Sequence, residues 1–263
     1  MTKGRNDLWK ITKCIANPFI SVESAVRNIP LSQKEQLVKQ QEEEKAVAEA
    51  KKHAEKDYRS RRNCLMEWLK DLIKSILAGV MISIGCIINL SCDNKYIGAM
   101  LFSIGLITIL LFDFNLYTGK VCYIPNNKPN YILKVLLILV GNILGCAVIG
   151  MLFPITPISV CINKLSYELQ TVLIKSIMCG LLIYIAVDSY KIHNTLLPTL
   201  FCIPTFILSG YIHVIADTFY FVSARVFNIN VIIYILVSAI GNALGGMLIP
   251  FIYNTKLINQ KEK

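Results

Sequence analysis

Long apolar segments separated by short polar stretches dominate the chain after residue 67. Six such segments fall at about residues 68–90, 96–119, 132–154, 169–188, 196–221 and 230–253. A helix needs about 20 residues to cross the ~30 Å hydrocarbon core of a bilayer, and each segment is long enough. The pattern predicts an all-α membrane protein with six transmembrane helices.

The chain before these segments is polar and is expected to be helical over residues 31–67. Ser32 is a candidate N-cap with Glu35 as its capping-box partner. Two pairs of opposite charge are spaced to interact along one helix face, namely Glu55–Arg59 and Asp57–Arg61. We therefore divide the chain into an N-terminal extension (1–67), a six-span transmembrane domain (68–254) and a C-terminal tail (255–263).

The second and the fifth apolar segments are interrupted by polar and small residues. The second contains LFDFNLYTGK at residues 111–120, and the fifth contains SGYIHVIADTFYF at residues 209–221. In lipid, freed backbone groups cost several kcal/mol unless they are buried in protein or face a water-lined cavity. Two broken helices at matching positions indicate a central pathway through the protein.

A short motif recurs in the third and the sixth segments. GNILGCAVIG begins at Gly141, and GNALGGMLIP begins at Gly241. Three spans separate the copies, so the two halves would have opposite orientations in the membrane, as in an inverted 3+3 repeat. The alternative is chance recurrence, because short glycine-asparagine motifs are common in membrane helices. Within each copy, glycines four residues apart allow helices to approach closely.

Charge and composition support a membrane protein and indicate no cofactor or nucleic acid. Of the 263 residues, 54% are hydrophobic and 17% are charged, whereas about 25% is usual for soluble chains. The net charge of +10 does not indicate nucleic-acid binding, because residues 31–63 hold nine basic and seven acidic residues. The nine cysteines contain no CxxC motif and lie mostly in apolar runs, so neither a metal site nor a disulfide framework is expected.

Basic residues flank the apolar region at both ends. Arg59, Arg61, Arg62, Lys70 and Lys74 precede it, and Lys256, Lys261 and Lys263 follow it. The positive-inside rule and an even number of spans place both termini in the cytoplasm. We expect a multi-pass protein of the cell (inner or plasma) membrane.

Six ordered segments resemble the formate/nitrite transporter family. Two segments are similar to its two signatures, GAMLFSIGLITILLFDFNLYTGK (98–120) and SGYIHVIADTFYF (209–221). The two glycine-asparagine motifs, which begin at Gly141 and Gly241, match its third and sixth spans. Two more segments match its first and fourth spans, ILAGVMISIG (76–85) and KSIMCGLLIYIAV (175–187). The similarity covers about residues 65–255. It implies a homopentamer of aquaporin-like protomers, each with its own narrow pore for a small monovalent anion such as formate, nitrite or hydrosulfide.

The resemblance also assigns roles to individual residues. His213 matches the family's pore histidine, Thr118 the loop threonine that faces it, and Lys164 a lysine at the outer mouth that attracts anions. Five residues match positions that form apolar constrictions on either side of the histidine: Phe102, Leu106, Leu116, Tyr117 and Phe206.

These residue types suit the transport of a weak-acid anion. A bare anion in an apolar constriction loses its hydration at great cost, whereas its neutral acid loses much less. Lys164 would concentrate anions at the mouth. Histidine, with an unperturbed pKa of about 6.5, can donate a hydrogen bond when neutral or a proton when charged. We expect the anion to pair with His213, or to receive a proton from it, with Thr118 bonding the ring or the solute.

Several positions depart from the family pattern and could tune selectivity. They are Asp113, Asn115, Lys120, Gly180 and Asp217. Gly180 stands where a pore asparagine is frequent, and its small size would widen the path. Ionised Asp113 and Asp217 would repel anions unless burial kept them neutral or a cation, Lys120 or Arg225, paired with them.

Three other functions remain open. The introduced acids and Gly180 would suit a channel for neutral solutes. A non-conducting membrane scaffold or sensor would use the polar helix at 31–67. An enzyme is the least expected, because the sequence shows no nucleophile–base pair, metal cluster or phosphate loop.

Overall fold

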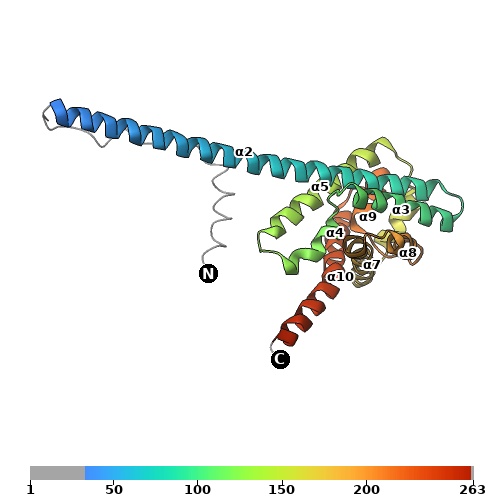
Figure 1. The fold of residues 1–263 in the computed structure, drawn as a ribbon. Helices are drawn as coiled ribbons and strands as arrows, with labels where there is room; N and C mark the ends of the chain where they lie inside the picture. Colours follow the sequence, from blue (N-terminus) through green and yellow to red (C-terminus); the bar gives the residue numbers. More distant parts are fainter. Residues whose placement is uncertain (1–32, 262–263) are drawn as a thin grey trace. The chain divides into compact units, whose positions relative to one another are not determined.

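The computed structural model describes residues 33–261 and consists there of helices joined by short connections (Figure 1). In chain order the elements are α2 (Gln33–Ser91), α3 (Lys95–Leu111), α4 (Tyr117–Lys120), the 3-10 helix η1 (Val121–Asn126), α5 (Tyr131–Leu152), α6 (Ile158–Leu165), α7 (Leu169–His193), α8 (Leu197–Leu208), α9 (Val214–Ser223) and α10 (Ile229–Lys261). The helical fold agrees with the sequence-based prediction.

The chain forms two compact units, Met1–Lys70 and Asp71–Lys263, and α2 contributes to both. In the first unit the two predicted ion pairs form, with distances of 2.8 Å for Glu55–Arg59 and 2.9 Å for Asp57–Arg61. The predicted N-cap, Ser32, lies outside the described residues. The domain boundaries at 67/68 and 254/255 stay predictions.

Within the part of the chain that the structure describes, four helices are long and apolar enough to cross a membrane. They are the Glu42–Ser91 part of α2, then α5, α7 and the Ile229–Ile252 part of α10. The other two predicted segments are interrupted at the expected places, because the chain leaves helical geometry between α3 and α4 and again between α8 and α9. The shorter pieces α3, α8 and α9 are apolar helices that do not reach the length of a full span.

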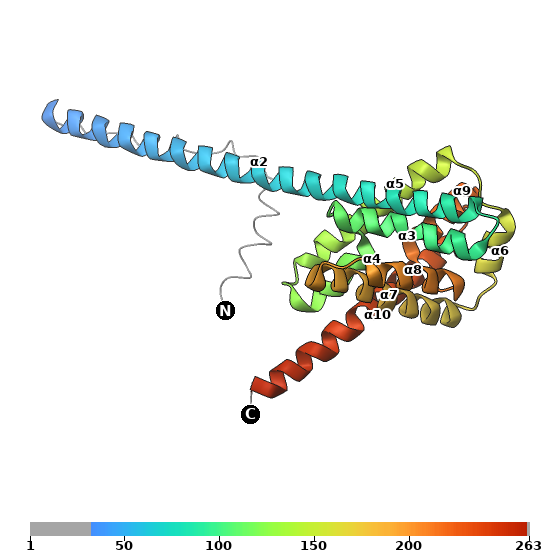
Figure 2. The ribbon, with the colours of Figure 1, turned by 45° about the vertical axis from the view of Figure 1, so that its right-hand side comes forward.

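Close helix packing in the second unit depends on glycines at corresponding positions of the two halves. In α2, a Cβ on Gly79 would overlap the carbonyl oxygen of Asn142 in α5, and in α7 a Cβ on Gly180 would overlap that of Asn242 in α10. Figures 1 and 2 both show α7 and α10 side by side. Helices approach this closely only where a glycine removes the side chain.

Gly180 therefore has a different role from the one that the sequence suggested. We expected its small size to widen a pathway, but the space that a side chain would need is occupied by the backbone of Asn242. The glycine allows α7 to contact α10.

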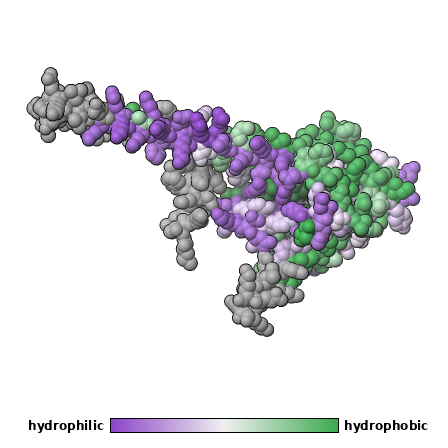
Figure 3. All heavy atoms as spheres, in the orientation of Figure 1, coloured by the Kyte–Doolittle hydropathy of each residue, from purple (hydrophilic) through white to green (hydrophobic). Residues whose placement is uncertain are grey.

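Apolar side chains cover much of the outside of the second unit (Figure 3). On α5 and on α10, exposed residues recur at every fourth position and form one stripe along each helix. The stripes are Leu136, Val140, Leu144 and Val148 on α5, and Leu236, Ile240, Leu244 and Leu248 on α10. Apolar patches of this extent suit contact with lipid or with another protein surface.

Alanine substitutions at two adjacent glycines of α10 test the close packing. A Cβ at Gly245 would overlap the carbonyl oxygen of Ile177, whereas a Cβ at Gly246 would lie 3.4 Å from the Cβ of Cys122, which is an ordinary contact. We expect Gly245→Ala to lower the free energy of unfolding by roughly 1–3 kcal/mol, as overpacking does. We expect Gly246→Ala to be neutral or slightly stabilising, because alanine favours helix. The unfolding temperature of each variant, measured in detergent, tests both expectations. Equal unfolding temperatures for Gly245→Ala and Gly246→Ala would contradict the proposed close contact at Gly245.

Candidate functional site

The two helix breaks have the same backbone geometry. After α3, Asp113 has a positive φ of 49°, and the N–H of Phe114 donates to the carbonyl of Ile109 at 2.9 Å. After α8, Gly210 has a φ of 63°, and the N–H of Tyr211 donates to the carbonyl of Phe206 at 2.9 Å. Glycine adopts positive φ without strain, and aspartate is among the few other residues found there. The structure therefore makes the same turn twice.

A buried asparagine holds the first break in place. The Asn142 Oδ1 accepts a 2.7 Å hydrogen bond from the N–H of Tyr117, the first residue of α4. Its Nδ2 donates to the carbonyls of Ser75 at 2.7 Å and Asn115 at 2.8 Å. One amide side chain thus satisfies two backbone groups of the break, the Tyr117 N–H and the Asn115 carbonyl, and also bonds to the uninterrupted helix α2 at Ser75.

Asn242 does the same at the second break. Its Oδ1 accepts from the N–H of Val214, the first residue of α9, at 2.9 Å. Its Nδ2 donates to the carbonyls of Ser176 and Ile212, both at 2.8 Å. We call Asn142 and Asn242 the bridging asparagines. Sequence analysis did not assign them to the site, although their signal was present in the repeated glycine-asparagine motif.

The breaks bring together Thr118 and His213, the two residues expected at the centre. The Thr118 Oγ1 and the His213 Nε2 are 3.0 Å apart, and both side chains are buried. His213 is the N-cap of α9, and its Nδ1 accepts a hydrogen bond from the N–H of Ala216 at 3.2 Å. Because Nδ1 is an acceptor, Nε2 carries the proton of the neutral ring and donates to Thr118.

Apolar and aromatic side chains surround this pair. All five expected constriction residues are buried, namely Phe102, Leu106, Leu116, Tyr117 and Phe206. The Phe206 ring stacks on His213 with the ring centroids 5.8 Å apart, and Phe102 packs edge-on against Phe206 at 5.9 Å. The Tyr117 hydroxyl donates to the carbonyl of Ala239 at 3.1 Å. His213 is 2% exposed, so the described conformation encloses the ring.

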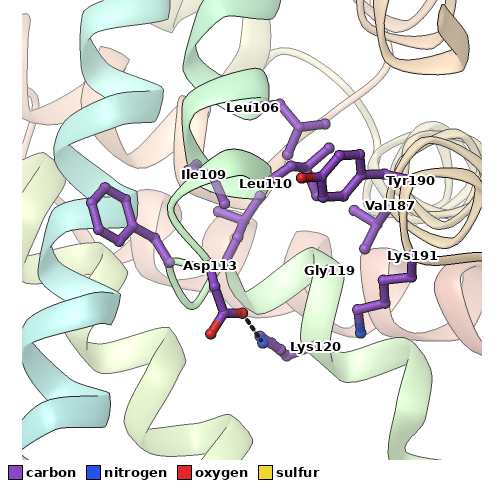
Figure 4. A pocket seen from close by; sticks show the side chains of 11 residues that line it. Leu106, Ile109, Leu110, Asp113, Gly119, Lys120, Val187, Tyr190 and Lys191 are labelled. Atoms are coloured by element: carbon purple, nitrogen blue, oxygen red, sulfur yellow. Dashed lines mark hydrogen bonds and ion pairs between the residues drawn. The ribbon is translucent and has the colours of Figure 1, made fainter. Parts of the chain in front are cut away.

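A pocket approaches the constriction residues from the side of the first break (Figure 4). Its volume is about 80 Å³, and Leu106 and Leu116 are among its apolar lining residues. Asp113 and Lys120 also line it and form a 3.5 Å ion pair, which Figure 4 shows as a dashed line. Lys74 approaches Asp113 more closely, at 2.8 Å. Lys120 therefore pairs with Asp113, as considered from sequence, but shares it with a second lysine.

The pairing of the other introduced acid differs from the expectation. Asp217 forms a 3.0 Å ion pair with Lys164 and accepts a 2.6 Å hydrogen bond from the hydroxyl of Tyr234. Arg225 had been considered as its partner, but the guanidinium donates to the carbonyl of Met151 instead. Lys164, which the resemblance assigned to the attraction of anions, thus has its charge compensated within the protein.

Asn115 contributes to the position of the first break. Its Nδ2 donates to Asp71 Oδ1 at 3.0 Å, and its N–H donates to the carbonyl of Lys74 at 3.2 Å. These bonds join the break to the part of α2 that lies in the second unit. Asn115 therefore helps to fix the backbone of the first break against α2.

The cysteines of the second unit lie mostly in the core. Cys86, Cys146, Cys161 and Cys179 are buried, and each cysteine that the structure describes is a free thiol. Between residues 42 and 252, no three histidine, cysteine or acidic side chains gather to hold a metal ion.

Removal of a bridging asparagine tests its contribution to stability. Asn242→Ala leaves the buried Val214 N–H and Ile212 carbonyl of the break without these partners, at a cost of about 1–3 kcal/mol for each unmet group, and it also removes the bond to Ser176 of α7. We expect the purified protein to unfold at a markedly lower temperature in detergent. Asn163→Ala, at an exposed position of α6, is the matched control and is expected to leave the unfolding temperature unchanged. Similar unfolding temperatures for both variants would show that the bridges contribute little.

Comparison with known proteins agrees with the resemblance noted in the sequence. The family model described as formate/nitrite transporter matches residues 43–255. One similar solved structure, a pentameric formate channel with formate bound, has a TM-score of 0.58 at 17% identity, over 73% of this chain and 98% of that one. Another, an FNT family ion channel, has a TM-score of 0.61 at 19% identity, over 74% and 92%. No curated protein sequence matches the chain. The extent of the family match and the shared fold show that this multi-pass membrane protein belongs to the formate/nitrite transporter family.

Proposed function

We propose that the chain is a channel or secondary transporter for a small monovalent weak-acid anion of the formate, nitrite or hydrosulfide class. The observation that carries the proposal is the His213–Thr118 pair, a hydrogen-bonded polar group enclosed by apolar rings. Ionisable residues at membrane depth are costly to maintain, and they usually mark a substrate or proton pathway. The family match and the similarity to a formate channel support the same reading.

The proposed architecture is a six-span, aquaporin-like protomer with an inverted 3+3 repeat. It is supported by the equivalent bonds of Asn142 and Asn242, which lie 100 positions apart, and by the identical turns at the two breaks. The exposed apolar stripes on α5 and α10 would contact lipid or neighbouring protomers. A homopentamer fits these stripes, and the similar formate channel is described as pentameric.

In the proposed mechanism the anion replaces Thr118 as the acceptor of the His213 Nε2–H. The positive end of the α9 dipole lies at His213, its N-cap, and favours a negative charge there. The Ala216 N–H opposes a second proton on Nδ1, so the neutral ring acts as a hydrogen-bond donor. The anion takes a proton from the aqueous side and then crosses the apolar constriction as its neutral acid. The rings of Phe102 and Phe206 must move for solute to pass, because they enclose the histidine in the described conformation.

The orientation belongs to the same proposal. The basic residues that flank the apolar region place residues 1–67 and 255–263 on the cytoplasmic side of the cell membrane. The first of these segments would then form a cytoplasmic extension of the transmembrane domain (68–254).

A channel for small neutral solutes is the second candidate. The specific observation in its favour is that an acid is paired with a lysine at two places, Asp113 with Lys120 and Asp217 with Lys164. Paired charges attract anions less than free lysines do. The two candidates predict different substrates in the same assay.

Substitution of His213 tests the proposed mechanism in proteoliposomes. We expect His213→Asn to lower formate flux by about 10- to 100-fold, the value of a hydrogen bond to a charged group. We expect the rise of flux at lower pH to persist in this variant, because the anion takes its proton from the aqueous side and not from the ring. His193→Asn, at an exposed position near the end of α7, is the control. A flux in His213→Asn equal to that of the control would contradict a role for this ring.

A substrate panel separates the candidate functions. With the wild-type protein we expect formate and nitrite to pass much faster than glycerol. Faster flux of water or glycerol, with no anion flux, would favour the neutral-solute channel. An absence of flux in both series, together with partner binding through residues 31–67, would favour a scaffold or sensor.

A further inference from the structure

A buried ion pair lies one helical turn beyond His213. Asp217 follows His213 by four residues in α9, so the two share a helix face. Its Oδ1 lies 3.0 Å from the Nζ of Lys164 in α6, and its Oδ2 accepts the 2.6 Å bond from the Tyr234 hydroxyl in α10. The Lys164 ammonium also lies over the Tyr220 ring, 5.4 Å from its centroid. Three helices therefore hold one lysine and one acid in a fixed geometry.

The two members of the pair differ in exposure. The Lys164 side chain is 19% exposed, whereas that of Asp217 is 3% exposed. Solvent therefore reaches the lysine more readily than the carboxylate. Five thiol and phenol side chains lie close enough to be affected by the Asp217 charge: Cys86, Cys161, Cys179, Tyr220 and Tyr234.

We propose that the Asp217 carboxylate is a built-in competitor for the anion site on Lys164 and thereby sets how strongly the protein binds its substrate. The proposal rests on the anion transport proposed above. A carboxylate side chain and a small carboxylate or nitrite ion present the same acceptor oxygens to an ammonium group. An anion that reaches Lys164 must compete with the negative charge of the carboxylate already bound there. Position 217 is therefore a specificity-determining position at which the acid weakens anion capture.

The competing explanation is a purely structural ion pair. Such a pair would hold α6, α9 and α10 together, and its loss would lower stability and maximal flux. Competition predicts a different result, because removal of the acid alone leaves a partly exposed lysine that an anion can bind. The half-saturation concentration and the maximal flux therefore separate the two explanations.

The experiment measures formate flux against formate concentration for Asp217→Asn, with the full chain in proteoliposomes. Asparagine has nearly the same shape and can still accept the Tyr234 hydrogen bond. We expect the half-saturation concentration to fall by about tenfold, because a free positive charge concentrates anions at the mouth. We expect the maximal flux to change much less. An unchanged or higher half-saturation concentration would overturn the proposal.

Three control variants identify the cause of the change. Asp93→Asn removes the same charge from an exposed position between α2 and α3 and is expected to have no effect. Tyr234→Phe keeps both charges, so a fall equal to that of Asp217→Asn would indicate a loosened site and overturn the proposal. Lys164→Met is expected to raise the half-saturation concentration, because it leaves an unpaired acid. The double variant Lys164→Met/Asp217→Asn is expected to have a lower half-saturation concentration than Lys164→Met. Its half-saturation concentration should still be higher than that of Asp217→Asn, because the lysine is missing.

The double variant also keeps the proposal testable if Asp217→Asn does not assemble. A Lys164→Met/Asp217→Asn protein that transports no better than Lys164→Met would then overturn it. Failure of this inference is distinguishable from failure of the proposed function. If the wild-type protein transports anions and Asp217→Asn transports them identically, only the proposed competition by Asp217 is refuted. If the wild-type protein transports no anion at all, the transport function itself is refuted.

Discussion

The structure depends on the hydrogen bonding of a backbone that leaves helical geometry at membrane depth. Every polar group freed there must find a partner inside the protein, because lipid offers none. The bridging asparagines, Asn142 and Asn242, each meet this requirement with two hydrogen bonds to the break and join it by a third to a continuous helix, α2 or α7. Because glycines at 79 and 180 allow the helices to approach closely, the asparagines can reach across to both sides of each break.

With their backbone groups hydrogen-bonded, the two breaks form a small polar centre surrounded by apolar side chains. Thr118 and His213 come from different breaks and bond to each other, while Phe206 stacks on the imidazole. The two acids near the breaks are paired with lysines, Asp113 with Lys74 and Lys120 and Asp217 with Lys164. The electrostatics therefore combine a neutral, hydrogen-bonding centre with compensated charges on either side of it.

The sequence predicted the helical elements and both breaks, because these depend on local signals, and the family resemblance predicted that Thr118 and His213 lie together. Polar residues within apolar runs indicated both breaks, and the family signatures indicated that Thr118 and His213 meet. Contacts between helices far apart in the sequence were not predictable in this way. The partner of Asp217 proved to be Lys164 and not Arg225, and the space at Gly180 is filled by the backbone of another helix. Composition and spacing do not encode which helix packs against which.

The two breaks share their backbone but differ in the residue that precedes each new helix. Leu116 is the N-cap of α4, and His213 is the N-cap of α9. Each is followed by the N–H that a bridging asparagine accepts. The bonds of the bridging asparagines therefore involve the backbone beside each cap and not the cap side chain. Leu116 makes no side-chain cap bond, whereas His213 also caps α9 through Nδ1. The first cap position can therefore change its side chain, and with it the selectivity of the protein over evolution, without loss of a bond that holds the framework.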